Sequence, residues 1–86
     1  MARLTLDTLV RIMRESAGEE EGVDLDGDIL DTLFIDLGYD SLALLQTTGR
    51  IERDFGIELD DYVLAEAETP RALLELVNAD LDELVA

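Results

Sequence analysis

The chain has 86 residues and a formal net charge of −16, with 22 acidic residues against six basic ones, and 48% of its residues are hydrophobic. This length and apolar content fit a single folded domain over residues 1–86. The charge disfavours nucleic acid as a partner, because phosphates would be repelled, and favours a cationic protein surface. An acidic surface also simply keeps a small protein in solution.

The chain contains neither cysteine nor histidine. A Cys/His metal site and a disulfide framework are therefore excluded, and a serine nucleophile would lack the histidine that commonly activates it. The segment 1–7 reaches an acidic residue too early for the apolar region of a signal peptide, and no apolar run is long enough to span a membrane. We therefore expect a cytoplasmic protein without a membrane segment.

Apolar residues at helical spacing predict a first helix, with Thr5 as its N-cap and Gly18 as its stop. Its expected core stripe consists of Leu6, Leu9, Val10, Met13 and Ala17.

Residues 19–40 form an acidic connection that is long for a compact domain. Recurring apolar residues predict that this loop is pinned onto the core, with one helical turn near 29–34. These residues are Val23, Leu25, Ile29, Leu30, Leu33, Phe34 and Leu37. The acids at 24, 26 and 28 resemble a calcium loop, but the EF-hand pattern requires glycine and glutamate where Ile29 and Ile35 stand. We therefore interpret them as part of a solvated loop.

A second helix is predicted from Ser41 to Phe55, ended by Gly56. Its apolar residues at helical spacing are Leu42, Leu45, Ile51 and Phe55. The residues expected to face outward are Gln46, Thr47, Arg50, Glu52 and Arg53.

A short third helix is expected near 62–66, capped by Asp60 or Asp61. Thr69 and Pro70 then provide a cap and a first helical position for a last helix, which reaches about Leu84. The whole pattern predicts an all-α fold. It is a small four-helix bundle, with three main helices, one short helix and a long loop between the first and second helices.

The segment 38–42, Gly-Tyr-Asp-Ser-Leu, joins the acidic loop to the second helix. Ser41 falls in the first helical turn, where unpaired backbone N–H groups and the positive end of the helix dipole favour a phosphate, bound or covalently attached. The alternative is that Asp40 or Ser41 only caps the helix, since both residue types are favoured there.

The segment 36–42, Asp-Leu-Gly-Tyr-Asp-Ser-Leu, resembles the attachment site of acyl carrier proteins, and the order of helices agrees with that family. The resemblance implies that Ser41, between Asp40 and Leu42, carries covalent 4′-phosphopantetheine, whose thiol holds acyl groups as thioesters. The missing cysteine then has a reason, because the reactive sulfur belongs to the cofactor. The resemblance also implies that the chain, as a phosphoprotein, acts as a carrier and not as an enzyme.

Within the family, the type II polyketide synthase branch, which serves antibiotic biosynthesis, looks closest. The segments 38–44, 50–56 and 69–74 resemble it, whereas fatty-acid carriers usually have an acidic residue where this chain has Ala43. The resemblance implies malonyl and growing polyketide groups as cargo. The implied partners are a phosphopantetheinyl transferase, a ketosynthase with its chain-length factor, a malonyl transferase, and ketoreductase, cyclase and aromatase enzymes. We expect a monomer.

Carriers often dock through a glutamate where this chain has Gln46, so the docking contacts of that turn do not transfer directly. Gln46, Glu52, Asp60 and Asp61 are the candidate docking residues.

Arg71 and Asn78 are seven residues apart and therefore lie on one side of the last helix, with Leu74 between them. The resemblance implies that they hydrogen-bond the carbonyls of a polyketide folded back into the bundle. The alternative is that the Arg71 stem covers apolar surface with its head in water, while Asn78 faces solvent at the edge of the stripe.

A peptidyl carrier is disfavoured, because its serine usually follows Gly-Gly, whereas Tyr39 and Asp40 precede Ser41 here. Two other functions remain open. A fatty-acid carrier would share the attachment chemistry. An acidic mimic of nucleic acid would need the negative charge but no particular serine.

Overall fold

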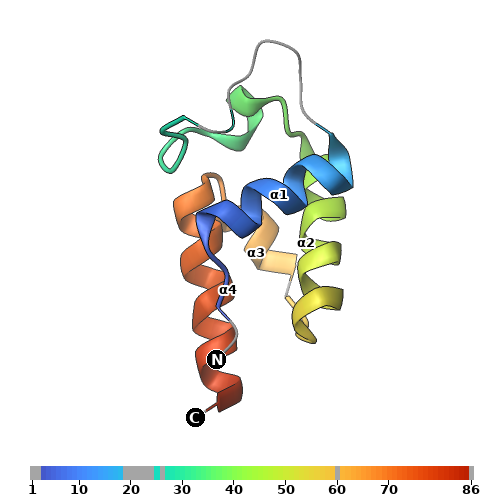
Figure 1. The fold of residues 1–86 in the computed structure, drawn as a ribbon, viewed down its shortest axis with the longest axis vertical. Helices are drawn as coiled ribbons and strands as arrows, with labels where there is room; N and C mark the ends of the chain where they lie inside the picture. Colours follow the sequence, from blue (N-terminus) through green and yellow to red (C-terminus); the bar gives the residue numbers. More distant parts are fainter. Residues whose placement is uncertain (1–2, 19–24, 26, 60, 86) are drawn as a thin grey trace.

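The computed structural model describes residues 3–18, 25, 27–59 and 61–85. Its elements are the α-helices α1 (Leu6–Ala17), α2 (Ser41–Phe55), α3 (Asp61–Glu66) and α4 (Pro70–Val85), with a 3₁₀-helix η1 (Phe34–Leu37) before α2. Helix α1 packs on both α2 and α4, and α3 also contacts both of them. Figure 1 shows α1 lying across the ends of α2 and α4, with α3 between these two longer helices. The all-α prediction is confirmed.

Side-chain caps define where the helices begin. The Thr8 amide donates to Thr5 Oγ1 at 3.3 Å, and the Ala72 amide donates to Thr69 Oγ1 at 3.2 Å. Helix α1 ends at Ala17, and its C-cap Gly18 has a φ of 74°. These bounds agree with the sequence prediction because capping depends on neighbouring residues.

The core draws most of its buried apolar side chains from α1, from α4 and from the segment before α2. The buried apolar residues include Leu9, Ile12, Met13, Leu25, Ile29, Phe34, Leu37, Tyr39, Ile51, Val63, Leu73, Val77 and Leu81. The expected pinning of the loop onto the core is therefore confirmed at Leu25, Ile29, Phe34 and Leu37. Leu30 is half-buried, Leu33 is exposed, and Val23 lies outside the described residues. The predicted helical turn near 29–34 was placed too early, since the 3₁₀-helix begins at Phe34. Ala17 is also exposed, contrary to the predicted stripe of the first helix.

Helix α2 confirms only the C-terminal part of the apolar stripe that the sequence indicated, where Ile51 is buried. Thr47 and Thr48 are buried, whereas Leu42 and Leu45 are 64% and 55% exposed. The threonines tolerate burial because Thr47 Oγ1 donates to the Ala43 carbonyl at 2.9 Å, and Thr48 Oγ1 donates to a carbonyl of the same helix at 3.2 Å. The expected outward position of Thr47 was therefore wrong, as was the expected core position of the two leucines.

Backbone hydrogen bonds attach the segment before α2 to the segment that leads into α4. The Phe34 amide donates to the Glu68 carbonyl at 2.8 Å, and the Arg71 amide donates to the Leu30 carbonyl at 2.9 Å. The start of α2 is thereby positioned relative to the start of α4. No helix among the described residues is long and apolar enough to cross a membrane.

Candidate functional site

Ser41 is the first residue of α2, and the residue before it caps the helix. The Ala43 amide donates to Asp40 Oδ1 at 2.9 Å, and the Leu44 amide donates to the Asp40 carbonyl at the same distance. Asp40 therefore performs the capping that the sequence also allowed for Ser41. The Ser41 side chain is exposed at the positive end of the helix dipole, so the cap and the attachment site are compatible.

The chain turns sharply just before this serine. Gly38 has a φ of 85°, a conformation that glycine adopts readily, and its amide donates to the Ile35 carbonyl at 3.1 Å. The next residue, Tyr39, is buried, and its hydroxyl donates to the Gly18 carbonyl after α1. The turn and this anchor fix the direction from which the backbone enters α2.

A cavity of about 370 Å³ opens beside Ser41, and its lining is largely apolar. It is lined by Leu33, Phe34, Ile35, Tyr39, Asp40, Ser41, Leu44, Ala65, Ala67 and Glu68. A larger hollow of about 510 Å³ is lined by residues of α1 together with Leu25 and Gly27, but Ser41 does not line it. The chemistry that Ser41 can support therefore belongs to the smaller cavity, where an apolar group tethered to the serine would find apolar walls.

Four large apolar side chains near Ser41 are exposed to solvent. Ile35 is 72% exposed, and Leu33, Leu42 and Leu45 are exposed as well. The sequence pattern did not identify Ile35 as a surface residue, and it placed Leu33, Leu42 and Leu45 against the core. A helical projection of α2 could have separated Leu45 from Ile51 and Phe55, because at 100° per residue it falls on another side of the helix.

The predicted docking residues differ in their surroundings. Gln46 is exposed, whereas Glu52 is half-buried and its Oε2 accepts a hydrogen bond from the Leu59 amide at 2.9 Å. Asp60 lies outside the described residues, and Asp61 begins α3. A role in docking stays a prediction for all four, although Glu52 also holds the chain that follows α2.

Arg71 and Asn78 line one hollow of about 240 Å³ together with Leu74, so they share a side of α4 as expected. Arg71 donates to Asp31 through Nε at 2.7 Å and Nη2 at 3.2 Å. These hydrogen bonds lower the pKa of the Asp31 carboxyl and raise the pKa of the Arg71 guanidinium.

Asn78 is buried, so the alternative in which its side chain faces solvent is wrong. Its Oδ1 accepts from the Leu4 amide at 2.8 Å, and its Nδ2 donates to the Leu4 carbonyl at 2.9 Å. Neither Asn78 nor Arg71 lines the cavity beside Ser41. Contact of these two residues with an acyl chain stays a prediction.

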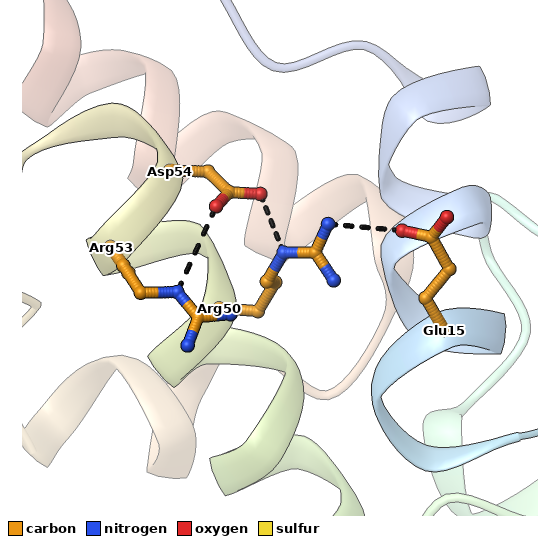
Figure 2. Close-up of polar contacts among 4 residues, drawn as sticks. All are labelled: Glu15, Arg50, Arg53 and Asp54. Atoms are coloured by element: carbon orange, nitrogen blue, oxygen red, sulfur yellow. Dashed lines mark hydrogen bonds and ion pairs between the residues drawn. The ribbon is translucent and has the colours of Figure 1, made fainter.

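Arg50 connects α2 to α1, as Figure 2 shows. Its Nη2 lies 3.0 Å from Glu15 Oε1, and its Nε lies 2.6 Å from Asp54 Oδ2. Hydrogen bonding and charge from Asp54, with a smaller effect from Glu15, raise the pKa of Arg50. Arg50 is therefore half-buried and engaged between the helices, rather than simply facing outward.

The site fits covalent attachment of a phosphate-linked arm. It offers an exposed hydroxyl in the first turn of a helix with a fixed start, and an apolar cavity beside that hydroxyl. In agreement with this arrangement, residues 7–77 match the family described as the phosphopantetheine attachment site. The chain belongs to this family of carrier proteins, which bear covalent 4′-phosphopantetheine.

Its relatives include acyl carrier proteins of polyketide synthases. The oxytetracycline carrier of Streptomyces rimosus is 58% identical over 94% of this chain and 85% of its own length. The granaticin carrier of Streptomyces violaceoruber is 59% identical over 91% of this chain and 92% of its own. The octanoyl form of the actinorhodin carrier from Streptomyces coelicolor is 50% identical, with a TM-score of 0.88 over 95% of both chains. This chain is accordingly a carrier rather than a catalyst.

Proposed function

We propose that Ser41 carries the 4′-phosphopantetheine arm, and that the arm holds malonyl and growing polyketide groups as thioesters. The single carrier domain of residues 1–86 presents them, as a cytoplasmic monomer, to type II polyketide synthase enzymes. These are the ketosynthase with its chain-length factor, the malonyl transferase, and the ketoreductase, cyclase and aromatase enzymes. A phosphopantetheinyl transferase installs the arm. High identity to the oxytetracycline and granaticin carriers supports the polyketide branch.

The observation that carries the proposal is the exposed Ser41 side chain at the start of α2, beside the apolar cavity. The Asp40 cap fixes the first turn, so the serine Oγ leaves the helix in a defined direction. Once the arm is attached, its thiol supplies the chemistry of thioester formation. The chain's own residues position the arm and offer apolar walls to its cargo.

The chain contains one other serine, which serves as a matched control. Ser16 Oγ is buried and has no hydrogen-bond partner among the described residues, so a transferase cannot reach it without local opening of α1. Incubation with a phosphopantetheinyl transferase and coenzyme A, followed by intact-mass measurement, should add one arm to the wild type and to Ser16→Ala. Ser41→Ala should gain none. It should still fold, because Asp40 and not Ser41 provides the cap.

Modification of Ser41→Ala, or a wild-type protein that stays unmodified, would overturn the assignment. The second outcome would favour an acidic interaction protein that needs no serine. Asp40→Asn separates the cap from a direct role in the transferase interface, since asparagine is also a good cap. Modification of this variant at the wild-type rate means that Asp40 acts only as a cap. Loading of the modified protein with malonyl groups then tests the cargo.

A further inference from the structure

One side of α2 is exposed from its first turn to its last. Leu42, Leu45, Gln46, Gly49 and Arg53 are all exposed, and their spacing of three, four, seven and eleven residues from Leu42 places them on one side of the helix. We call these five residues the α2 stripe. It spans about 16 Å along the helix axis, at about 1.5 Å per residue, and it begins next to Ser41.

The acidic residues of α2 do not project from the stripe. Glu52 borders it, but the side chain is half-buried and its carboxylate accepts from the Leu59 amide. Asp54 lies on the other side of the helix, where Arg50 holds its carboxylate at 2.6 Å. The part of the stripe from Leu42 to Gly49 is therefore uncharged.

Arg53 gives the stripe its only charge. Its side chain is 76% exposed, and its one ion pair among the described residues joins Nε to Asp54 Oδ1 at 3.9 Å, the outer limit for such a contact. Figure 2 shows Arg50 reaching across to α1, whereas the contact drawn for Arg53 runs to Asp54 in the same helix. Because the terminal guanidinium nitrogens carry most of its hydrogen-bond donors, Arg53 retains the capacity to bind a carboxylate in a second protein.

This local charge is opposite to that of the whole chain, which is −16. Long-range attraction by the chain favours cationic surfaces, but the contact itself is decided by groups at short range. We infer that α2 docks against a synthase surface that is apolar opposite Leu42 and Leu45 and carries a carboxylate opposite Arg53. Arg53 is then a specificity residue, because a basic docking surface would meet a like charge at that end of the stripe.

The inference rests on the proposed carrier function, so its test begins with protein whose arm has been confirmed by mass. Wild type, Arg53→Gln and Arg53→Glu are loaded with malonyl groups, and their fold is checked by circular dichroism. The probe is the ketosynthase and chain-length factor of the oxytetracycline synthase. The measurement is kcat/KM for the carrier at about 0.1 M and about 1 M sodium chloride, where the Debye length falls from about 10 Å to about 3 Å.

Arg3→Glu is the matched control, because it makes the same change in charge. Arg3 is exposed and pairs with Asp82 of α4 at 3.6 Å, rather than with a group on α2. An effect of net charge alone would appear equally in Arg3→Glu and Arg53→Glu.

At about 0.1 M salt, we expect Arg53→Gln to lower kcat/KM about 2- to 5-fold, as for one partly exposed ion pair. Arg53→Glu should lower it about 5- to 20-fold, whereas Arg3→Glu should change it less than about 2-fold. The differences should shrink at about 1 M salt. An unchanged or faster Arg53→Glu, or an equal loss in Arg3→Glu, would overturn the inference. Failure to gain the arm would instead refute the carrier function and is seen before any kinetic measurement.

Discussion

The contact between Asn78 and Leu4 makes a strong prediction about stability. Substitution of Asn78 by alanine removes two hydrogen bonds, to the Leu4 amide and the Leu4 carbonyl. Each is worth about 1 kcal/mol, and a buried backbone group left without a partner costs about 1–3 kcal/mol unless water reaches it. Because Leu4 is only 2% exposed, we expect Asn78→Ala to lower the free energy of unfolding by about 2–3 kcal/mol.

That loss is large for a domain of this size, whose total stability is about 4–13 kcal/mol at the usual per-residue range. At about 4–8 °C per kcal/mol, the melting temperature should fall by roughly 10–20 °C. Urea unfolding followed by circular dichroism measures the free energy, and hydrogen exchange of the Leu4 amide reports the contact itself. Glu83→Ala, at an exposed position of the same helix, controls for substitution in α4.

A loss below about 0.5 kcal/mol, together with unchanged exchange of the Leu4 amide, would refute the reasoning. It would show that Asn78 does not hold the N-terminal segment, and would leave its side chain available to an acyl chain. If the prediction holds, a polyketide carbonyl that hydrogen-bonds Asn78 has to compete with Leu4.

Two further predictions concern charge. Raising sodium chloride from about 0.1 M to about 1 M should raise the melting temperature, because screening weakens the mutual repulsion of the acidic residues; a flat or falling curve with chelator present would indicate locally paired acids. The contact with Arg71 lowers the pKa of the Asp31 carboxyl. The stability that this contact contributes is therefore present above the unfolded-state pKa of about 3.9, and it is lost as the pH falls through the lower folded-state pKa. Asp31→Asn should accordingly give a shallower loss of stability in urea melts below about pH 4, and a profile identical to the wild type would contradict this.

The helices were predictable because their ends are local features. The caps at Thr5, Asp40 and Thr69 each act on an amide three residues later, so a short window of sequence contains both partners. The position of Ser41 in the first turn of α2 was predicted in the same way, from the residues next to it. The start of α3 was predicted within one residue; of its two expected caps, Asp61 is the first residue of the helix and Asp60 lies outside the described residues.

The contacts that the sequence did not reveal join distant parts of the chain. Asn78 and Leu4 are 74 positions apart, and Arg71 and Asp31 are 40 apart. Spacing along α2 separates Leu42 and Leu45 from Ile51, which lies opposite Leu42, but it does not tell which side α1 covers. Leu42 therefore looked like a core residue until the packing of the helices was known.

The backbone links that attach the 30–34 segment to the start of α4 have a consequence for how such carriers can diversify. They use the amides of Phe34 and Arg71 and the carbonyls of Leu30 and Glu68. These backbone groups remain when the side chains are changed, unless proline replaces one of the two residues that donate an amide. The side chains of the α2 stripe can therefore be exchanged to suit a different synthase while the arm still leaves the protein from the same point. The surface that contacts the partner and the point from which the arm leaves the protein can therefore change independently.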